Sequence, residues 1–579
     1  MKLVEALEAV ERNLPAESPL LNVQFACGFT PLHLLTFLKA HLRSHFPEHR
    51  VEIAAGLFGD LAGNLERAES VDGDATAAVI EWQDLDPRLG LRALGGWAPR
   101  HLDDISRNVR DQALRLGDLL ERVSRSRTVT VALPTLPLPP VAFTPGWQTG
   151  SFESSVRAAV AELSVRLASL PGIRLASEQR LDRLSPPAAR LDVRSDLTAG
   201  FPYSLGHADA LAGLLARMIR NPSSKKGLIT DLDDTLWMGI LGEIGVENIA
   251  WDLDHHAQRH GLYQQMLASL AESGVLIAVA SKNDPLVVDE AFQRTGLILS
   301  RERIFPLEIH WDPKSESVTR ILHAWNIGAD SAVFIDDSSL DLAEVKAAHP
   351  GIECLLFPRD DDKAVYQLLE DLRDLFGKQA LSEEDAIRLD SLRTAHAAVD
   401  SAPSAGSSPE RFLEQAEGKL TLNFEKHSRD ARALELINKT NQFNLNGKRH
   451  TEASWKRYLG EPQVFLAVAS YEDRFGPLGK IAVIAGRRNG SRLTVDHWVM
   501  SCRAFSRRIE HGCLLRVLEK FGAEEATFDF SSTPRNGPLQ TFFAGLLGAI
   551  PEGSFSLRRE QAVEKSPPVY LEIRESAHE

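Results

Sequence analysis

A short apolar run that ends in carboxylates constrains the fold more than any other stretch of this chain: Leu228-Ile229-Thr230-Asp231-Leu232-Asp233-Asp234-Thr235. Residues two apart on a strand point to the same side, so Asp231 and Asp233 can converge where the strand ends. Two carboxylates at one point suit Mg²⁺, which takes oxygen ligands and binds substrate phosphates. One carboxylate can attack phosphorus while the other transfers protons.

Further apolar runs in the same part of the chain also end in polar side chains. The near-continuous apolar character of these runs fits strands buried on both faces of a parallel sheet. Open sheets of this kind bind ligands at the carboxyl ends of their strands. The polar groups expected at that edge are Ser281-Lys282-Asn283 after Val275–Ala280, Lys314 after Leu307–Trp311, and Asp336-Asp337 after Ala332–Ile335.

Length and composition exclude several classes of protein. At 579 residues the chain is long enough for roughly three to four domains. It has no run of about 18 apolar residues, so we expect no membrane span. The net charge of −15 argues against general nucleic-acid binding, which needs a basic face. The four cysteines show no CxxC spacing, so we expect a cytoplasmic protein with free thiols: Cys27, Cys354, Cys502 and Cys513.

Strands that alternate with helices predict an α/β chain with parallel sheets. We expect a first α/β domain at residues 1–221, a second at 222–380, a helical segment and linker at 381–409, and a third, mixed α/β domain at 410–579. The joint near Asn221-Pro222-Ser223-Ser224-Lys225 is polar, and the stretch His396–Pro409 is rich in Ala, Ser, Pro and Gly, as linkers are.

The four polar motifs of the second domain resemble those of the haloacid-dehalogenase (HAD) phosphatases. The resemblance implies that Asp231 is the nucleophile, that Asp233 protonates the leaving alkoxide, and that Mg²⁺ is held by the acidic residues Asp231, Asp233, Asp336 and Asp337, with Asp233 using its backbone carbonyl. Thr235, Ser281, Lys282, Asn283 and Lys314 would bind the phosphate. An isolated Asp-x-Asp can simply cap a helix, but four motifs in the family order favour the site.

The flanking residues resemble a narrower branch, the FkbH-like proteins. The matching stretches are Asp231–Glu243, Ala280–Pro285 and Trp311–Ser317 in the second domain, and Thr440–Leu445, Asp473–Gly476 and Met500–Arg503 in the third. The resemblance implies an enzyme that takes D-1,3-bisphosphoglycerate, holds the acyl group as a thioester and removes phosphate in the HAD site. It would then load the glyceryl unit onto the phosphopantetheine of an acyl carrier protein in polyketide or related biosynthesis.

This branch implies a third domain with the GNAT acyltransferase fold and a first domain similar to SGNH hydrolases. Two departures stand out. The first is Met238, which replaces the glycine that is usual in the flap following Asp231–Thr235. The second is Arg503-Ala504-Phe505-Ser506-Arg507-Arg508, which has Ser and Arg where GNAT glycines let backbone N–H groups approach a pyrophosphate. A carrier arm with one phosphate therefore suits the third domain better than acetyl-CoA.

Cys502 is the candidate for the acylated thiol. It lies where a strand meets a helix, beside Arg503 and near Arg507 and Arg508, and cations and helix N-termini lower the pKa of a thiol. The arginines are also candidates for docking an acidic carrier protein, although such a run can equally be a solvated helix face. Cys502 can also be read as a buried structural cysteine.

The competitor is Cys27, which follows a strand as the nucleophile of SGNH hydrolases does. Those enzymes end in Asp-x-x-His, whereas this chain has Ser204-Leu205-Gly206-His207, so we expect a first domain without catalytic function. Cys513 has the spacing of a core position. Two other functions stay open: a stand-alone small-molecule phosphatase, and a carrier-protein docking scaffold with a vestigial HAD site.

Overall fold

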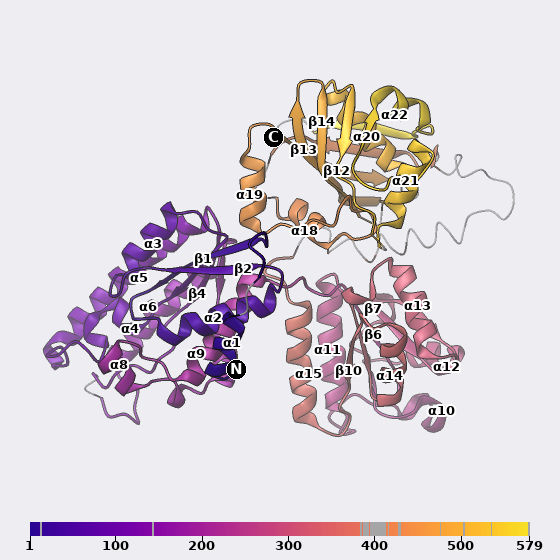
Figure 1. Cartoon of the computed structure of the whole chain (residues 1–579). Coiled ribbons are helices and arrows are strands. Elements are labelled where there is room, and N and C mark those ends of the chain that lie inside the picture. Colours follow the sequence, from indigo (N-terminus) through magenta and orange to yellow (C-terminus); the bar gives the residue numbers. More distant parts are fainter. Residues whose placement is uncertain are drawn as a thin grey trace. The chain divides into compact units, whose positions relative to one another are not determined.

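The computed structural model describes residues 1–11, 14–141, 144–381, 385, 389, 393, 413–414, 416–426, 430–474, 476–501, 504–505, 507–533 and 535–576. They form a mixed α/β protein with three sheets (Figure 1). They divide into two compact units, Met1–Pro222 with His450–Arg457, and Ser223–Arg449 with Tyr458–Glu579. Among the described helices, none combines the length and the apolar character that crossing a membrane requires.

The first sheet has five parallel strands in the order β2-β1-β3-β4-β5. Its strands are β1 Leu20–Cys27, β2 Arg50–Ala55, β3 Ala75–Val79, β4 Thr128–Ala132 and β5 Ile173–Leu175. The helices are α1 Leu3–Glu11, α2 Leu32–His45, α3 Leu61–Ser70, α4 Trp82–Leu85, α5 Leu102–Ser124, α6 Ser151–Ala168, α7 Glu178–Leu184, α8 Val193–Ala199 and α9 Leu205–Arg220.

Both faces of this sheet are covered by helices. Successive residues of a strand point to opposite faces, so neighbouring residues of β1 pack against different helices. Phe25 and Cys27 pack with residues of α2 and α9, whereas Ala26 packs with residues of α3, α5 and α6. The apolar run Ala77–Trp82 predicts a strand that reaches Trp82, but β3 ends earlier, at Val79. Trp82 begins α4, where the Asp84 carboxylate accepts a hydrogen bond from the backbone N–H of Glu81 (2.7 Å) and closes the first turn.

The second sheet also has five parallel strands, in the order β10-β9-β6-β7-β8. They are β6 Gly227–Thr230, β7 Leu276–Ser281, β8 Ile304–Ile309, β9 Ala332–Asp336 and β10 Glu353–Leu356. Its helices are α10 Leu241–Ile244, α11 Gln258–Glu272, α12 Pro285–Ala291, α13 Lys314–Trp325, α14 Ser339–Ala348 and α15 Asp362–Phe376. The strand predicted at Leu307–Trp311 is shifted toward the N-terminus, and Trp311 is 75% exposed.

The strand order of this sheet reverses beside β6. The chain passes from β6 to β7 on one side and later returns to β9 on the other. Helices α11 and α15 cover one face and α13 and α14 the other (Figure 1). Since both neighbours of β6 run parallel to it, the loops after β6 and β9 open together at the carboxyl edge. A reversal of strand order at this edge is where open α/β sheets bind ligands.

The third sheet is mixed, with the order β16-β15-β14-β13-β12-β11-β17. Its strands are β11 Gly418–Asn423, β12 Val464–Asp473, β13 Gly476–Asn489, β14 Arg492–Met500, β15 Glu525–Phe528, β16 Phe555–Arg558 and β17 Leu571–Glu575. Strands β11 to β14 pair antiparallel, and β15 joins β14 in parallel. The helices are α18 Ala431–Lys439, α19 Glu452–Gly460, α20 Ile509–Lys520, α21 Gly537–Leu547 and α22 Arg559–Lys565.

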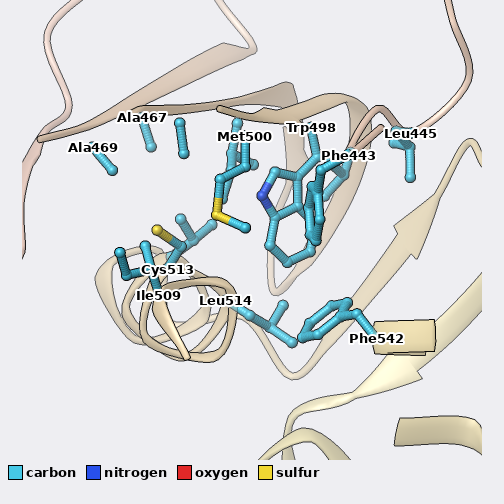
Figure 2. Packing of buried hydrophobic residues seen from close by; sticks show 14 of the residues in the cluster. Phe443, Leu445, Ala467, Ala469, Trp498, Met500, Ile509, Cys513, Leu514 and Phe542 are labelled. Atoms are coloured by element: carbon cyan, nitrogen blue, oxygen red, sulfur yellow. The ribbon is translucent and has the colours of Figure 1, made fainter. Parts of the chain in front are cut away.

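The core of this third region is aromatic. Figure 2 shows Trp498 of β14 beside Phe443, and Cys513 of α20 facing Met500. The ring centroids of Trp498 and Phe443 are 5.6 Å apart and inclined by 68°, an edge-to-face arrangement that stabilises aromatic pairs. Phe542 of α21 closes the cluster, its ring centroid 5.3 Å from that of Trp498.

Candidate active site

The candidate site lies at the carboxyl edge of the second sheet. Asp231 follows β6 directly, and its backbone N–H donates to the carbonyl of Ile335 in β9 (3.0 Å). Asp336 is the last residue of β9 and is fully buried. Parallel pairing of the two strands therefore brings these carboxylates, 105 positions apart in the sequence, to neighbouring points of one edge.

Lys314, the first residue of α13, connects the two carboxylates. Its ammonium lies 3.0 Å from Asp231 Oδ2 and 2.6 Å from Asp336 Oδ2, and all three side chains are buried. Burial opposes the charge of the lysine, but the adjacent Asp231 and Asp336 raise its pKa above the usual range. The lysine is therefore cationic, and it neutralises part of a strongly negative site.

Three carboxylates of this edge form a cluster that fits a hard cation. Oxygens of Asp231, Asp336 and Asp337 lie within 4.8 Å of one another. Burial, followed by the charge of Asp231, raises the pKa of Asp336 to about 7. The second oxygen of Asp231, Oδ1, is buried without a hydrogen-bond partner among the described residues. An all-oxygen set with an unpartnered carboxylate oxygen is the kind of site that Mg²⁺ occupies.

Asp233 lies beside this cluster but its carboxylate is not part of it. Its Oδ1 accepts a hydrogen bond from the indole of Trp237 (3.0 Å), and its Oδ2 accepts one from the amide of Asn283 (2.9 Å). Burial raises the pKa of Asp233, while these two hydrogen bonds lower it. A carboxyl group that hydrogen bonds keep in place, and whose pKa is raised, is suited to donating a proton and taking it back.

The predicted phosphate-binding residues Ser281, Thr235 and Lys282 differ in their surroundings. Ser281 ends β7, is buried, and accepts a hydrogen bond from Asn283 (3.3 Å). Thr235 is fully buried and its hydroxyl has no partner among the described residues. Lys282 instead pairs with Asp341 of α14 at 2.8 Å. The structure thus brings Ser281 and Asn283 to the carboxylates and holds Lys282 on an acidic partner.

Three residues that support the site were missed by the sequence reasoning. Trp237 orients Asp233, Asp341 lies 3.8 Å from Lys314 as well as beside Lys282, and Arg359 pairs with both Asp234 and Asp337 at 3.1 Å. Trp237 falls within Asp231–Glu243, the stretch that resembles the FkbH-like proteins, and this resemblance was the only sequence signal for it. Asp341 and Arg359 belong to no motif, and only the fold brings them near.

The first sheet carries the other candidate nucleophile, Cys27, in a closed environment. Its thiol is buried and donates to the carbonyl of Phe29 (3.0 Å), and burial raises the pKa to about 12. His207 is bound elsewhere, to the hydroxyls of Thr135 (2.9 Å) and Ser185 (3.0 Å). Neither of these histidine contacts involves the thiol.

We expect His207 to make the first unit lose stability in mild acid. Burial, then the charge of Arg190, lowers its pKa from 6.5 to about 3. The unfolded chain therefore binds this proton at a higher pH than the folded one, and stability is lost as the pH falls from 6.5 toward 3. From pH 7 to pH 5, the free energy of unfolding of the wild-type protein is expected to fall by about 2 kcal/mol more than that of His207→Gln. Urea unfolding at both values checks this; equal pH dependence of the two proteins would contradict it.

The predicted acyl-carrying residue, Cys502, and its neighbour Arg503 lie outside the described residues. Of the two other arginines predicted to dock a carrier, Arg507 pairs with Asp473 at 3.2 Å, and Arg508 donates to the carbonyl of Pro568 (2.8 Å). Arg508 has a left-handed backbone, φ 58°, immediately before α20. Both side chains therefore make contacts within the third region of the chain.

Thiol labelling separates the structural cysteines from a reactive one. Cys513 is fully buried in the core of Figure 2, and burial raises its pKa. The thiolate is the reactive form, so we expect Cys27 and Cys513 to react with iodoacetamide about 100-fold or more slowly than free cysteine in the native protein. Peptide mass spectrometry with and without urea measures this. Rapid native labelling at either position would show that its burial is not maintained.

Comparison with known proteins supports the fold of this region. No protein-family model matches the chain, and neither does any curated protein. Among solved structures, the chain is similar to the N-terminal part of the protein BF1531 from Bacteroides fragilis, described as containing a phosphatase domain complexed with Mg. The identity is 20%, the TM-score is 0.52, and the match covers 66% of this chain and 100% of the other.

This likeness shows a shared fold, in agreement with the HAD-type domain expected from the motifs. A second match, an uncharacterized protein from Corynebacterium glutamicum, is 16% identical and covers 27% of this chain and 99% of the other. Its TM-score of 0.20 is too low to support an argument. Fold and site together describe an α/β protein with a carboxylate cluster that fits Mg²⁺ at the carboxyl edge of its second sheet.

Proposed function

We propose that this chain is a HAD-type, Mg²⁺-dependent phosphatase that acts on a phosphate ester. The observation that carries the proposal is the buried arrangement of Asp231 and Asp336 on either side of Lys314, at 3.0 and 2.6 Å from its ammonium. A structural ion pair needs one carboxylate, whereas a phosphoryl site needs a nucleophile, a cation and a metal ligand together. Burying three such charges is costly, so a catalytic role explains them better than stability does.

Asp231, Asp336 and Asp337 are the residues that would hold the metal, with the backbone carbonyl of Asp233 as a further oxygen. Mg²⁺ at this place would neutralise phosphoryl oxygens and orient the phosphate. Lys314 supplies a positive charge beside Asp231. Ser281 and the hydroxyl of Thr235 add neutral donors, which completes a site suited to a phosphoryl group whose charge is spread over three oxygens.

The reaction proceeds through Asp231 and Asp233. A carboxylate oxygen of Asp231 attacks phosphorus, the bond from phosphorus to the ester oxygen breaks, and Asp233 gives its proton to the leaving alkoxide. Asp233, now a carboxylate, then takes a proton from a water molecule. The resulting hydroxide attacks phosphorus, which releases phosphate and restores Asp231. The hydrogen bonds from Trp237 and Asn283 hold Asp233 in place through both steps.

The finer proposal is that the phosphatase serves glyceryl loading. The substrate would be D-1,3-bisphosphoglycerate, its acyl group would pass to Cys502 as a thioester with release of the 1-phosphate, and the 3-phosphate would be removed at Asp231. The glyceryl unit would then move to the phosphopantetheine thiol of an acyl carrier protein. The motifs shared with the FkbH-like branch on both sides of the linker support this, because a phosphatase alone requires only those of the second sheet.

One experiment tests both levels of the proposal. The full chain is mixed with bisphosphoglycerate and Mg²⁺, phosphate release is measured, and the intact protein is weighed. Glyceryl loading predicts phosphate release together with a glyceryl adduct that is absent in Cys502→Ala. Phosphate release without an adduct would leave the phosphatase and remove the loading step. An adduct that persists in Cys502→Ala but disappears in Cys27→Ala would move the thioester to Cys27. No turnover would favour the docking scaffold.

A further inference from the structure

A positively charged pocket lies in the region of the third sheet, and none of its lining residues belongs to the candidate active site. Its volume is about 220 Å³, and it is formed by two loops, one before α19 and one after β15. The lining residues are Asn441, Asn444, Gly447, Arg449, Thr533 and Arg535. All of the lining side chains are polar and the only charges among them are positive, which is the composition of an anion site rather than of an apolar cleft.

The two loops that form this pocket are held together by hydrogen bonds. The backbone N–H of Leu445 donates to the carbonyl of Trp498 in β14 (3.0 Å), and the N–H of Ser531 donates to the carbonyl of Leu445 (3.0 Å). The buried amide of Asn536 donates to the carbonyls of Asn444 (3.0 Å) and Ser531 (2.9 Å). The first loop is therefore fixed between β14 and the second loop, and the pocket is built before any ligand arrives.

Arg449 is an exposed cation of this pocket, and its hydrogen bonds go only to neutral groups. Its guanidinium donates to the carbonyls of Ile437 and Thr440 and to the amide oxygen of Asn441. Within the part of the chain that the structure describes, no carboxylate lies within ion-pair distance of it. Burial, then the charge of Arg535, lowers the pKa of Arg449. The charge of Asp330 opposes this effect. Two like charges beside one pocket repel each other, and an anionic ligand between them would offset the repulsion.

The pocket also offers neutral donors to such a ligand. The hydroxyl oxygen of Thr533 accepts hydrogen bonds from the backbone N–H groups of Arg535 (3.3 Å) and Asn536 (3.2 Å). Since that oxygen is already an acceptor, its own proton is left to donate. The side-chain oxygen of Asn441 accepts from Arg449, so its amide N–H groups are directed away from the guanidinium. Two cations and at least one hydroxyl thus converge on a small volume.

We propose that this pocket binds the phosphate group of a phosphate monoester, with Arg449 and Arg535 as its cationic ligands and Thr533 as a hydroxyl donor. A phosphate monoester carries nearly two negative charges at neutral pH and matches two guanidiniums, whereas a carboxylate matches one. The inference goes beyond the proposed function, because this site binds a phosphate and the site at Asp231 cleaves one.

Two sources can supply such a phosphate: a free phosphorylated acid, or the phosphopantetheine arm of a carrier protein. Calorimetric titration of the full chain in metal-free buffer distinguishes them. The probes are inorganic phosphate, 3-phosphoglycerate with glycerate as its control, and 4′-phosphopantetheine with pantetheine as its control. We expect the phosphorylated member of at least one pair to bind at least tenfold more tightly than its control. Which pair does so identifies the source.

Variants assign the binding to this pocket. Arg449→Gln is expected to weaken the phosphorylated probe at least tenfold, and Arg449→Lys to weaken it less. Lys448→Gln removes the same charge one residue away, where the lysine pairs with Asp529 at 2.5 Å, and is expected to change the affinity less than twofold. The Arg535 side chain is 69% exposed and pairs with the exposed Asp330 at 3.5 Å. If Arg449→Gln does not fold, Arg535→Gln tests the pocket instead, and it is also expected to weaken the phosphorylated probe.

Either of two results would overturn the inference. One is a wild-type chain that binds none of the phosphorylated probes more tightly than their controls. The other is a Lys448→Gln variant that weakens binding as much as Arg449→Gln or Arg535→Gln, which would show general attraction to positive charge. Both results are independent of catalysis at Asp231, since binding is measured without Mg²⁺ and without turnover.

Discussion

Asp231→Asn is expected to lower the phosphatase turnover of this chain by about 10⁴-fold. The amide has the shape of the carboxylate but cannot attack phosphorus, and it offers a poorer oxygen to a metal. The fold is expected to persist, because Asp336 remains 2.6 Å from the ammonium of Lys314 and continues to neutralise it. Removing the charge of Asp231 also removes one cause of the raised pKa of Asp336, which favours the ionised carboxylate there.

Phosphate release from bisphosphoglycerate or a simple phosphate ester measures this loss, and urea unfolding measures the stability of the variant. Asp254→Asn is the matched control, because it makes the same change at an exposed position of the same region and is expected to retain full activity. If Asp231→Asn keeps more than a tenth of the wild-type turnover while remaining folded, another residue is the nucleophile.

Lys314→Met is expected to reduce the free energy of unfolding by about 3–5 kcal/mol, the loss typical of removing one partner of a buried ion pair. The substitution keeps most of the length of the side chain but leaves Asp231 and Asp336 buried beside each other without the cation. Lys282→Met is the matched control. Lys282 also pairs with a carboxylate, Asp341, but is 38% exposed, so solvent screens the pair and the expected loss is below about 1 kcal/mol.

The loss in Lys314→Met has a defined dependence on pH. Lys314 lowers the pKa of Asp336, so without the lysine the raised pKa of this carboxyl in the folded protein rises further above that in the unfolded chain. A group whose pKa is raised by folding stabilises the protein at low pH, and this contribution is lost as the pH rises through the folded value. The destabilisation is therefore expected to be larger at pH 8 than at pH 5, and added Mg²⁺ is expected to reduce it at pH 8.

Urea unfolding of both lysine variants at the two pH values, with and without Mg²⁺, measures these differences. Equal losses in Lys314→Met and Lys282→Met would mean that the buried triad is no more important to stability than a surface ion pair. A loss at pH 5 that equals the loss at pH 8 would mean that the two carboxylates are not forced together in the folded state.

Motif positions were predictable where a strand and its polar end are adjacent in the sequence. Asp231, Ser281 and Asp336 each lie at the end of a buried strand, as expected from the apolar runs before them. The predicted strand ends were wrong where a tryptophan continued the apolar run. Trp82 and Trp311 were both counted as strand residues, but the first begins a helix and the second faces solvent. Apolar character alone does not distinguish these environments.

The supporting contacts were not predictable because they join distant segments. Arg359 meets Asp234 across 125 positions, and Asp341 meets Lys282 across 59. Neither residue has a spacing or a neighbour that indicates its partner. The same holds for the pocket at Arg449 and Arg535, which are 86 positions apart in the sequence. Their loops meet through hydrogen bonds of the Leu445 backbone and the Asn536 amide.

The sequence by itself determined the α/β class of this protein, the strand ends of the second sheet and the kinds of side chain at its carboxyl edge. These follow from local patterns, since an apolar run forms a buried strand and the residue after it must lie at the edge. Only the tertiary structure decided that Lys314 neutralises Asp231 and Asp336 together, and that Arg449 and Arg535 line one polar pocket. Such features depend on which strands and loops become neighbours, and that is settled by the packing of the whole fold.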